Sequence, residues 1–446
     1  MFKQTIRSLT PAFLLRWYHF VLAKIAAAYY RHPSRQLIVI GVTGTNGKST
    51  TVQFIGRLLE STGKKVGWTS TAGFKVARNE WVNDQKMTML GRFQTQKLLR
   101  EMVDAGCSHA VVETSSQGIE QYRHIGIEYD VAVFTNLTPE HIEAHGGFEN
   151  YKGAKGKLFS YMASQPQKSI VSFPKTSVIN LDDAHASYFL SFNTDGHRIG
   201  YSLHPEKTEP IVADRLDVVH LMIGPTGTTF SIDGYPFSFK PLGEFYAANA
   251  LAAMAACRAV GESFEMLQAG VAALQSVPGR LERIDEGQPF TVIVDYAYEP
   301  YALAALYNVV PLFSPKRIIH ITGSAGGGRD VARRTEIGSF CAGHDDVVIV
   351  TNEDPYDEDP LQIIEAVADG ARAGGKQDGV DLYCILSRKE AIAKACALAK
   401  SGDLVLITGK GSEPVMAVAD GKKIPWDDRA VVRSILHKTI SSSVIE

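Results

Sequence analysis

A strand, a glycine-rich loop and a helix follow one another between residues 36 and 60, and this order constrains the fold more than any other feature of the chain. The apolar run QLIVI (36–40) leads into GVTGTNGKSTT (41–51), and VQFIGRLLE (52–60) then carries apolar residues at helical spacing. A helix that starts in such a loop directs several backbone N–H groups and the positive end of its dipole at one point. The stretch therefore predicts a polyphosphate site in an α/β fold.

This loop departs from the usual phosphate-binding pattern at one position. Val42 stands where G-x-x-x-x-G-K-[ST] has its first glycine, whereas Gly47, Lys48 and Ser49 keep the rest of the pattern. Lys48 would neutralise the β- and γ-phosphates, and the Ser49 hydroxyl would bind Mg²⁺. We therefore predict a nucleotide site with Mg²⁺. The loop residues expected to contact the nucleotide are Gly44, Thr45, Asn46, Gly47, Lys48, Ser49 and Thr50.

Strand and helix signals alternate along the rest of the chain, which is typical of a parallel sheet covered by helices on both faces. Glycine-separated alternating residues between about 195 and 240 instead predict antiparallel strands. A second strand and helix series begins after SVPGRLER (276–283). We predict three parts: a basic amphipathic helical segment (1–36), a central P-loop ATPase domain with a parallel sheet (37–277), and a C-terminal Rossmann-like α/β domain (278–446).

Composition and charge exclude some classes of partner. The 446 residues include 21% charged residues and have a net charge of -2, so no overall field favours nucleic acid, and we expect small-molecule substrates. The five cysteines form no CxxC pair, which argues against a zinc ribbon or a disulfide framework and fits a reducing cytosol. A cytoplasmic location is the expectation.

The first 36 residues contain six Lys/Arg and no acidic residue, and the first acid of the chain is Glu60. Arg16, His19 and Lys24 divide the apolar residues into runs too short to span a bilayer. On a helical wheel the basic residues fall mostly on one side and the apolar residues on the other. Two interpretations stay open: a helix docked on the body of the protein, or an interfacial helix in which residues 10–31 contact the inner face of the membrane, with Trp17 at headgroup depth.

The loop form GTNGKST is shared by the Mur ligases and the folylpolyglutamate synthetases, and residues 37–437 resemble the MurE branch of the Mur ligase family. The stretches that carry the resemblance are MTMLGRFQTQKLLREMVDAGCSHAVVETSSQGI (87–119), YDVAVFTNLTPEHIEAHGGFENYKGAKGKLF (129–159), VPGRLERID (277–285), VIVDYAYEP (292–300), GSAGGGRDVARRTEIG (323–338), VIVTNEDPYDEDP (348–360) and IPWDDR (424–429). The resemblance implies an ATP-dependent amide ligase of peptidoglycan precursor synthesis. In such an enzyme a substrate carboxylate attacks the γ-phosphate to form an acyl phosphate, which an amine then captures.

The resemblance also implies a second Mg²⁺ between the γ-phosphate and the incoming carboxylate, where it would shield their repulsion. Glu113 and His141 match the family's ligands for this ion. Lys155 matches the lysine that the family carries as a carbamate, a modification that turns a cation into a carboxylate ligand. Because CO₂ adds only to a neutral amine, the Lys155 side chain would have to be partly desolvated.

Three further residues are expected at the nucleotide by the same resemblance. Arg280 would reach the phosphates, Asp295 the ribose and Asn249 the adenine. Since these residues lie on both sides of the predicted boundary, the catalytic set of Lys48, Glu113, His141, Lys155 and Arg280 would be complete only when the two domains close. Closure would also keep water from the acyl phosphate.

The acceptor end differs from ordinary MurE sequences. Those enzymes carry a UDP-holding domain ahead of the phosphate loop, where this chain has only its basic helix, so the acceptor is left open between a UDP-linked and a lipid-linked muramoyl peptide. MTMLGRF replaces the family's Thr-Thr-Pro, SSQG replaces Ser-Ser-His, and Tyr298 stands where histidine is usual. The residues expected to bind the acceptor are Thr114, Ser115, Ser116 and Arg123.

The amine end differs as well. The diaminopimelate-adding enzymes use the arginine of Asp-Asn-Pro-Arg to hold the far carboxylate of the amino acid, and here Tyr356 takes that place. Asp354, Asp357 and Glu413 offer negative charge instead, which predicts a side chain that ends in an ammonium, such as lysine or ornithine. An arginine from the neighbouring loop (Arg329, Arg333 or Arg334) would restore diaminopimelate.

Three alternatives remain beside the MurE-like ligase. A folylpolyglutamate synthetase would use the same loop and the same chemistry, but lacks the ETSS and EDP stretches in this form. An enzyme of the MurT type would act on lipid-linked precursor, but its inserted cysteine cluster is absent from this sequence. A nucleotide-gated binding protein without ligase activity, tethered by its basic helix, has no need of Lys48, Glu113, His141 and Lys155 together.

Overall fold

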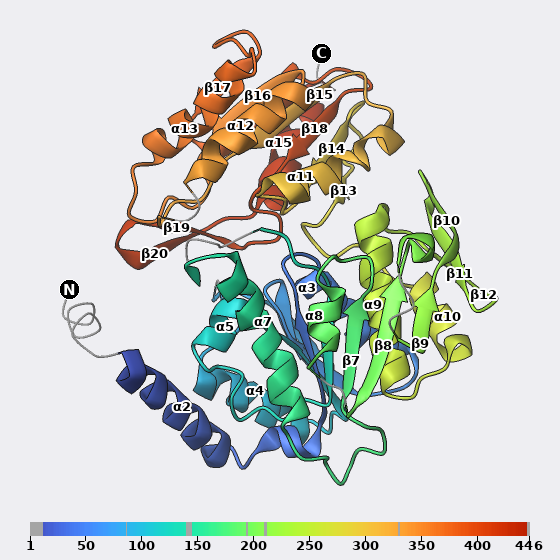
Figure 1. Cartoon of the computed structure of the whole chain (residues 1–446). Coiled ribbons are helices and arrows are strands. Elements are labelled where there is room, and N and C mark those ends of the chain that lie inside the picture. Colours follow the sequence, from blue (N-terminus) through green and yellow to red (C-terminus); the bar gives the residue numbers. More distant parts are fainter. Residues whose placement is uncertain are drawn as a thin grey trace.

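The computed structural model describes residues 12–85, 87–139, 145–192, 195–208, 212–328 and 331–443. The part of the chain after the first helix forms a nine-stranded sheet in the order β4-β3-β2-β5-β1-β6-β7-β8-β9 (Figure 1). Its strands are β1 (Ile38–Thr43), β2 (Val66–Thr69), β3 (Gly73–Val76), β4 (Asn79–Val82), β5 (His109–Glu113), β6 (Val131–Phe134), β7 (Thr176–Asn180), β8 (His197–Ser202) and β9 (Asp214–Asp217). All neighbours are parallel except the β2-β3 and β3-β4 pairs, which confirms the predicted parallel sheet.

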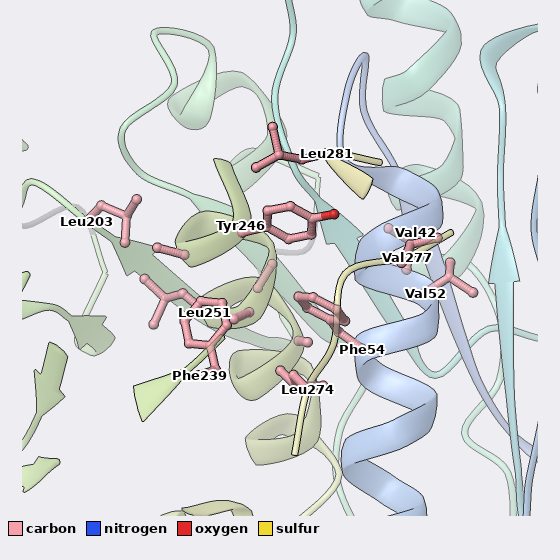
Figure 2. Close-up of a cluster of buried hydrophobic side chains, with 14 of the residues drawn as sticks. Val42, Val52, Phe54, Leu203, Phe239, Tyr246, Leu251, Leu274, Val277 and Leu281 are labelled. Carbon is pink, nitrogen blue, oxygen red and sulfur yellow. The ribbon is translucent and has the colours of Figure 1, made fainter. Parts of the chain in front are cut away.

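Helices cover both faces of this sheet, and the alternation of side chains along β1 shows why. Ile40 and Val42 belong to one apolar cluster, with residues of α3 and α9, whereas Val39 belongs to a second cluster, with residues of α4 and α7. Figure 2 shows part of the first cluster, in which Phe54 and Tyr246 stack. The helices are α3 (Lys48–Ser61), α4 (Arg92–Asp104), α5 (Ser116–Glu120), α7 (Phe148–Ala163), α8 (Ala186–Leu190), α9 (Glu244–Ala259) and α10 (Phe264–Ala272), with 3-10 turns η1 (Pro33–Gln36) and η2 (Pro205–Lys207).

The antiparallel strands predicted between 195 and 240 are confirmed only in part. A separate antiparallel sheet consists of β10 (Val219–Gly224), β11 (Gly227–Ile232) and β12 (Tyr235–Phe239). The prediction was wrong for β8 and β9, which extend the parallel sheet. Helix α8 lies between β7 and β8 and carries the chain back to the edge of the sheet at which β7 starts. Strand β8 therefore runs parallel to β7.

The C-terminal part is a second α/β unit with the strand order β13-β14-β18-β15-β16-β17. Only the β13-β14 pair is antiparallel, so the expected second α/β sheet is confirmed. Its strands are β13 (Glu282–Ile284), β14 (Thr291–Val294), β15 (Ile318–Thr322), β16 (Val347–Thr351), β17 (Leu382–Ile385) and β18 (Leu404–Ile407), and a hairpin of β19 (Val415–Val418) and β20 (Lys422–Pro425) follows. The helices are α11 (Pro300–Tyr307), α12 (Ala332–His344), α13 (Pro360–Ala373), α14 (Arg388–Leu398) and α15 (Asp428–Ser443), with 3-10 turns η3 (Val310–Phe313) and η4 (Ala419–Gly421).

The chain passes from the first unit to the second between α10 and β13, and the two large sheets share no strand. The division at 277/278 stays a prediction. Apolar packing crosses it, because Leu306 and Val309 belong to the same buried cluster as Tyr246. The carboxyl ends of β1, β5, β14 and β16 point toward the space between the units, where ligands of open α/β sheets bind.

An N-terminal helix, α2 (Ala12–Tyr29), packs along α4 at the edge of the first unit (Figure 1). Residues 10 and 11 of the predicted membrane-contacting segment lie outside the described residues. No described helix combines the length and the apolar character that a membrane crossing requires.

Candidate active site

A cavity of about 670 Å³ lies between the two units and is lined from both sides. The central unit contributes the phosphate loop, Glu113 at the end of β5 and Lys155 of α7. The C-terminal unit contributes Arg280, Asp295 after β14, and Glu353, Asp354 and Tyr356 after β16. The two units therefore enclose one shared space, as the positions of the polar loops predict.

Val42 is a strand residue, which explains why the phosphate loop tolerates the loss of its first glycine. β1 continues through Val42 to Thr43, and the Val42 side chain is fully buried in the apolar cluster of Figure 2. The loop begins at Gly44, directly after β1. Gly44 has a φ of 154°, and a Cβ there would lie 1.9 Å from Thr135 Oγ1. Gly47 has a φ of 82°, and a Cβ there would lie 2.2 Å from Asn249 Oδ1. Glycine is thus required at 44 and 47 but not at 42.

Hydrogen bonds from two neighbouring segments, and one within the loop, hold the loop in place. Thr45 N donates to Asn136 O over 2.8 Å, and Asn46 N donates to Asn136 Oδ1 over 2.8 Å. Thr45 Oγ1 lies 3.0 Å from Tyr151 OH, and Lys48 Nζ donates to Thr45 O over 2.6 Å. Because these contacts fix the loop, its remaining N–H groups and the start of α3 face the cavity already arranged for an anion.

Ser49 and Glu113, two of the expected metal ligands, are hydrogen-bonded to each other. Ser49 Oγ donates to Glu113 Oε2 over 2.7 Å, and the nearly fully buried carboxylate also accepts Thr71 N over 2.7 Å and Thr71 Oγ1 over 3.1 Å. Sequence reasoning missed Thr71, since nothing near it in the sequence indicates a ligand site. Hydroxyl and carboxylate oxygens are ligands that Mg²⁺ prefers, so this pair fits the ion.

Lys155 projects from α7 beneath the phosphate loop. Its side chain is buried, its Nζ donates to Gly44 O over 2.7 Å, and it lies 4.4 Å from the centroid of the Tyr151 ring. The desolvation expected of a lysine that becomes a carbamate is therefore present, although the carbamate itself stays a prediction. His141 lies outside the described residues, whereas Glu113 and Lys155 both line the cavity.

Arg280 and Asp295 line the cavity from the C-terminal unit. The guanidinium of Arg280 lies 3.8 Å from the centroid of the Tyr296 ring. Asp295 accepts Leu281 N over 2.6 Å and Ala297 N over 2.7 Å, so it also fixes the loop that follows Arg280. Burial raises the pKa of the Asp295 carboxyl, and the Arg280 charge and these N–H groups act in the opposite direction.

A direct contact joins the phosphate loop to the C-terminal unit. Asn46 Nδ2 donates to Glu299 Oε1 over 3.1 Å. The same carboxylate caps α11, where it accepts Tyr301 N and Ala302 N. Sequence reasoning did not identify Glu299, because a residue before a helix with proline at its start is most simply a cap. The contact supports the expectation that residues of both units complete the site.

The acidic residues of the expected amine end share a buried cation. Lys410 Nζ donates to Asp354 Oδ1 over 2.8 Å and to Glu413 Oε2 over 2.6 Å. Burial acts to lower the pKa of Lys410, but the two carboxylates outweigh it and raise that pKa. From the sequence alone, Asp354 and Glu413 are expected to carry uncompensated negative charge. The structure shows that the ammonium of Lys410 offsets part of this charge. Asp357 accepts Asp420 N over 2.9 Å at the surface.

Glu353 and Arg333 add to this end of the cavity. Burial, followed by the charge of Asp354, raises the pKa of Glu353 to about 7, and its Oε2 accepts no hydrogen bond from the residues that the structure describes. Of the three arginines considered beside Tyr356, Arg333 lines the cavity, with its guanidinium 5.3 Å from the centroid of the Tyr298 ring. Arg334 pairs with Glu358 over 2.7 Å, and Arg329 lies outside the described residues.

The residues expected at the acceptor end divide into two groups. Ser115, Ser116 and Arg123 line the cavity. Thr114 does not, because it is fully buried and donates to Val112 O over 3.2 Å. At the other expected positions, Thr50, Asn249 and Tyr356 line the cavity, whereas Gly44 is not among the lining residues.

The loop at the domain boundary touches the loop that carries Lys410. Gly279 has a φ of 66°, and a Cβ there would lie 2.1 Å from Ser412 N. A Cβ at Gly411 would lie 2.5 Å from Gly279 O. The two backbones are therefore packed directly against each other, without a side chain between them.

Comparison with known families and proteins was made on the whole chain. The Mur ligase middle domain matches residues 42–257, and the family described as Mur ligase, glutamate ligase domain matches residues 279–411. The UDP-N-acetylmuramyl-tripeptide synthetase of Roseiflexus sp. is 37% identical over 422 residues, which are 93% of this chain and 81% of the relative. The UDP-N-acetylmuramoyl-L-alanyl-D-glutamate–2,6-diaminopimelate ligase of Geobacillus thermodenitrificans is 36% identical over 94% of this chain and 82% of its own length.

Solved structures show the same likeness. The structure of a UDP-N-acetylmuramoyl-L-alanyl-D-glutamate–2,6-diaminopimelate ligase superposes with a TM-score of 0.59 at 29% identity, covering 91% of this chain and 79% of that one. Folylpolyglutamate synthase of Mycobacterium tuberculosis, complexed with ADP and AMPPCP, gives a TM-score of 0.67 at 20% identity, with 88% and 93% covered. The second likeness concerns the fold alone.

Proposed function

Since this chain belongs to the Mur ligase family of ATP-dependent acid–amino-acid ligases, we propose that it adds a diamino acid to the carboxylate of a muramoyl-peptide acceptor, as a MurE-type enzyme of peptidoglycan precursor synthesis. The observation that carries the proposal is the composition of the cavity. The phosphate loop, the Ser49–Glu113 pair and the charged group Asp354–Lys410–Glu413 line or adjoin one space of about 670 Å³. A nucleotide, a carboxylate and an amine can therefore meet there.

The proposed reaction has two steps. A carboxylate oxygen of the acceptor attacks the γ-phosphorus of ATP, and ADP leaves, which gives an acyl phosphate. The neutral amine of the amino acid then attacks the acyl carbon, phosphate leaves, and the nitrogen loses a proton to give the amide. Lys48 and Arg280 carry the positive charges that the cavity directs at the phosphates, and charge neutralisation of this kind is the main requirement of phosphoryl transfer.

Metal binding is the next part of the proposal. Ser49 would hold the Mg²⁺ that accompanies the nucleotide, and Glu113 with His141 would hold a second ion. Bound Mg²⁺ supplies charge that offsets the repulsion between the γ-phosphate and the acceptor carboxylate. The support is the Ser49–Glu113 geometry, in which both oxygens already face the same point of the cavity.

Carbamylation of Lys155 is proposed on its position and burial. The side chain lies at the edge of the phosphate loop, within 2.7 Å of Gly44 O, and is excluded from water. In the carbamate form its new oxygens would add a carboxylate to the metal-binding group formed by Glu113 and His141. The modification adds CO₂ to the neutral amine with loss of a proton, so it needs no other reactant.

For the amine we propose lysine or ornithine ahead of diaminopimelate. Tyr356 supplies no guanidinium at the lip of the cavity, and Asp354 and Glu413 favour a terminal ammonium even though Lys410 offsets part of their charge. Of Arg333 and Arg334, which both lie in α12, only Arg333 lines the cavity, and it is the residue through which diaminopimelate could be held instead.

A matrix of acceptors against amino acids tests the function. Purified protein with ATP and Mg²⁺ is given UDP-linked and lipid-linked muramoyl dipeptides, each with lysine, ornithine, diaminopimelate or glutamate, and ADP and product mass are measured. The proposal requires ADP formation that depends on both acceptor and amine. ADP formation from folate and glutamate, or nucleotide binding without any product, would contradict it.

We propose the cytoplasm as the place of action, which the five free cysteines support.

A further inference from the structure

Helix α2 carries large apolar side chains on the side that faces away from the protein. Ala23, Ala26 and Ala27 are fully buried where the helix packs along α4. At about 100° per residue, the side opposite these alanines is centred on Leu14, Tyr18 and Ile25. The exposed apolar residues on this side, called here the outer face, are Leu14 (44% exposed), Trp17 (65%), Tyr18 (55%), Ile25 (52%) and Tyr29 (72%).

This arrangement reverses what a docked amphipathic helix predicts. A helix docked for stability buries its large apolar residues, whereas α2 buries alanines and leaves three aromatic rings more than half exposed. The outer face continues onto α4, where Phe93 lies 6.2 Å from Tyr29 and is itself partly exposed. Continuous apolar surface of this kind on a protein marks a site of interaction.

The charges beside the outer face identify the kind of partner. Lys24, seven residues after Trp17 and therefore at the edge of the outer face, and Arg31, in the turn that follows the helix, are exposed, whereas the exposed Arg16 lies on the side of the buried alanines. The sequence has no acidic residue before Glu60, so the segment offers a partner only positive charge. A second copy of the same helix would bring like charges together. An apolar interior beneath a layer of negative charge is what this surface complements.

We propose that α2 lies flat on a lipid bilayer that carries anionic headgroups. Trp17, Tyr18 and Tyr29 would occupy the interface, where aromatic rings with one polar end are favoured, and Leu14 and Ile25 would enter the acyl region. Lys24 and Arg31 would lie among the headgroups. Because one short helix gives only modest affinity, the attachment is peripheral, reversible and weakened by salt.

The helix also adjoins the rim of the cavity. The Phe20 ring makes an edge-on contact with Tyr122 at 6.4 Å between centroids, and the neighbours of Tyr122, Gln121 and Arg123, line the cavity. A bilayer on the outer face of α2 would therefore lie one helix diameter, roughly 10 Å, from the segment that carries Gln121 and Arg123. The inference goes beyond the proposed ligase reaction and does not depend on it.

Co-sedimentation of the full chain with vesicles tests the proposal. Phosphatidylcholine vesicles with and without phosphatidylglycerol are compared at low and high salt. Three variants are measured beside the natural chain: Trp17→Ser/Ile25→Ser/Tyr29→Ser, which removes most of the outer face; Lys24→Glu/Arg31→Glu, which reverses the charges beside it; and Leu361→Ser/Val380→Ser, a control for exposed apolar residues elsewhere. Thermal unfolding of each variant establishes that it is folded.

The natural chain and the control should sediment with the anionic vesicles only, and less at high salt. Each of the other two variants should lose binding at least about tenfold, since each charge and each buried apolar side chain contributes separately. The proposal is overturned if the natural chain stays in the supernatant, or if the outer-face variant binds as well as the control. It is also overturned if the natural chain is a dimer in solution that the outer-face substitutions dissociate, because the outer face would then be covered by a second copy.

Discussion

Val42 of β1 and Glu113 of β5 are partners across two parallel strands. The residue that breaks the glycine pattern therefore lies beside the carboxylate that faces the cavity. Side chains alternate between the two faces of a strand, and that of Val42 points into the buried apolar cluster. Its packing holds the end of β1 in place, and the following residues turn into the loop. The position of Glu113 relative to Ser49 thus depends on the packing of Val42.

The first prediction concerns these two residues. Glu113→Gln should lower kcat roughly a hundredfold or more, because it removes negative charge from the expected metal site, while the melting temperature stays close to that of the natural protein. Val42→Gly should do the reverse: it should cost about 3 kcal/mol of stability through the cavity and the freed backbone, and should not improve ATP binding. Acceptor-dependent ADP release, ATP binding and thermal unfolding are measured for both. Near-normal activity in Glu113→Gln would remove this residue from the metal site.

The second prediction concerns Lys155. Lys155→Ala should be nearly inactive yet bind ATP almost normally, because the phosphate loop is held by Thr45, Asn46 and Asn136 independently of this lysine. Short carboxylic acids should restore part of its activity, and activity of the natural protein should fall when bicarbonate is removed. Lys157→Ala, on the exposed side of α7, is the matched control. Full activity of the natural protein without CO₂, with no rescue of Lys155→Ala, would argue against a carbamate.

The third prediction concerns the pH dependence of stability at Glu353. Its pKa is raised from 4.5 to about 7, so the folded protein holds this proton more tightly than the unfolded chain. The stabilisation that the protonated Glu353 carboxyl gives the folded state is complete below a pH of about 4.5 and is lost as the pH rises through about 7. Glu353→Gln, which is neutral throughout, should therefore melt at a higher temperature than the natural protein above that window. Melting curves across the window test this, and identical pH profiles of the two proteins would disprove it.

The fourth prediction concerns the amine. In competition at equal concentrations, lysine or ornithine should enter the product ahead of meso-diaminopimelate, because Tyr356 cannot hold a second carboxylate. Tyr356→Arg should shift the product toward diaminopimelate, and Arg333→Gln should not change the preference for lysine. Product mass gives the ratio. A preference for diaminopimelate that Arg333→Gln abolishes would show that Arg333 holds its far carboxylate.

Features with a local signal could be predicted from the sequence. The phosphate loop, the parallel strands and the polar loops at their carboxyl ends each depend on residues close in the chain, and the structure places them at one cavity. Thr71, Glu299 and Lys410 could not be found in this way. Lys410 meets Asp354 across 56 residues of sequence, and only the order β18-β15-β16 brings their loops together.

The orientation of α2 shows a second limit. Its apolar pattern is clear in the sequence, but the pattern does not say which side packs on the protein. Small side chains allow a close approach between helices, so the alanine side packs on α4 even though the opposite side is more apolar. Helical periodicity alone would have placed Tyr18 and Ile25 inside.

The backbone contact between Gly279 and Gly411 links the domain boundary to the loop of Lys410 and Glu413. Neither position can accept a side chain without moving the other loop. In related sequences the two positions should therefore change together or not at all. A substitution at the domain boundary near Gly279 would shift the backbone of the loop that carries Lys410 and Glu413 at the amine end. An enzyme that acquires a new amino acid substrate by remodelling that loop would have to preserve this contact or rebuild its hinge.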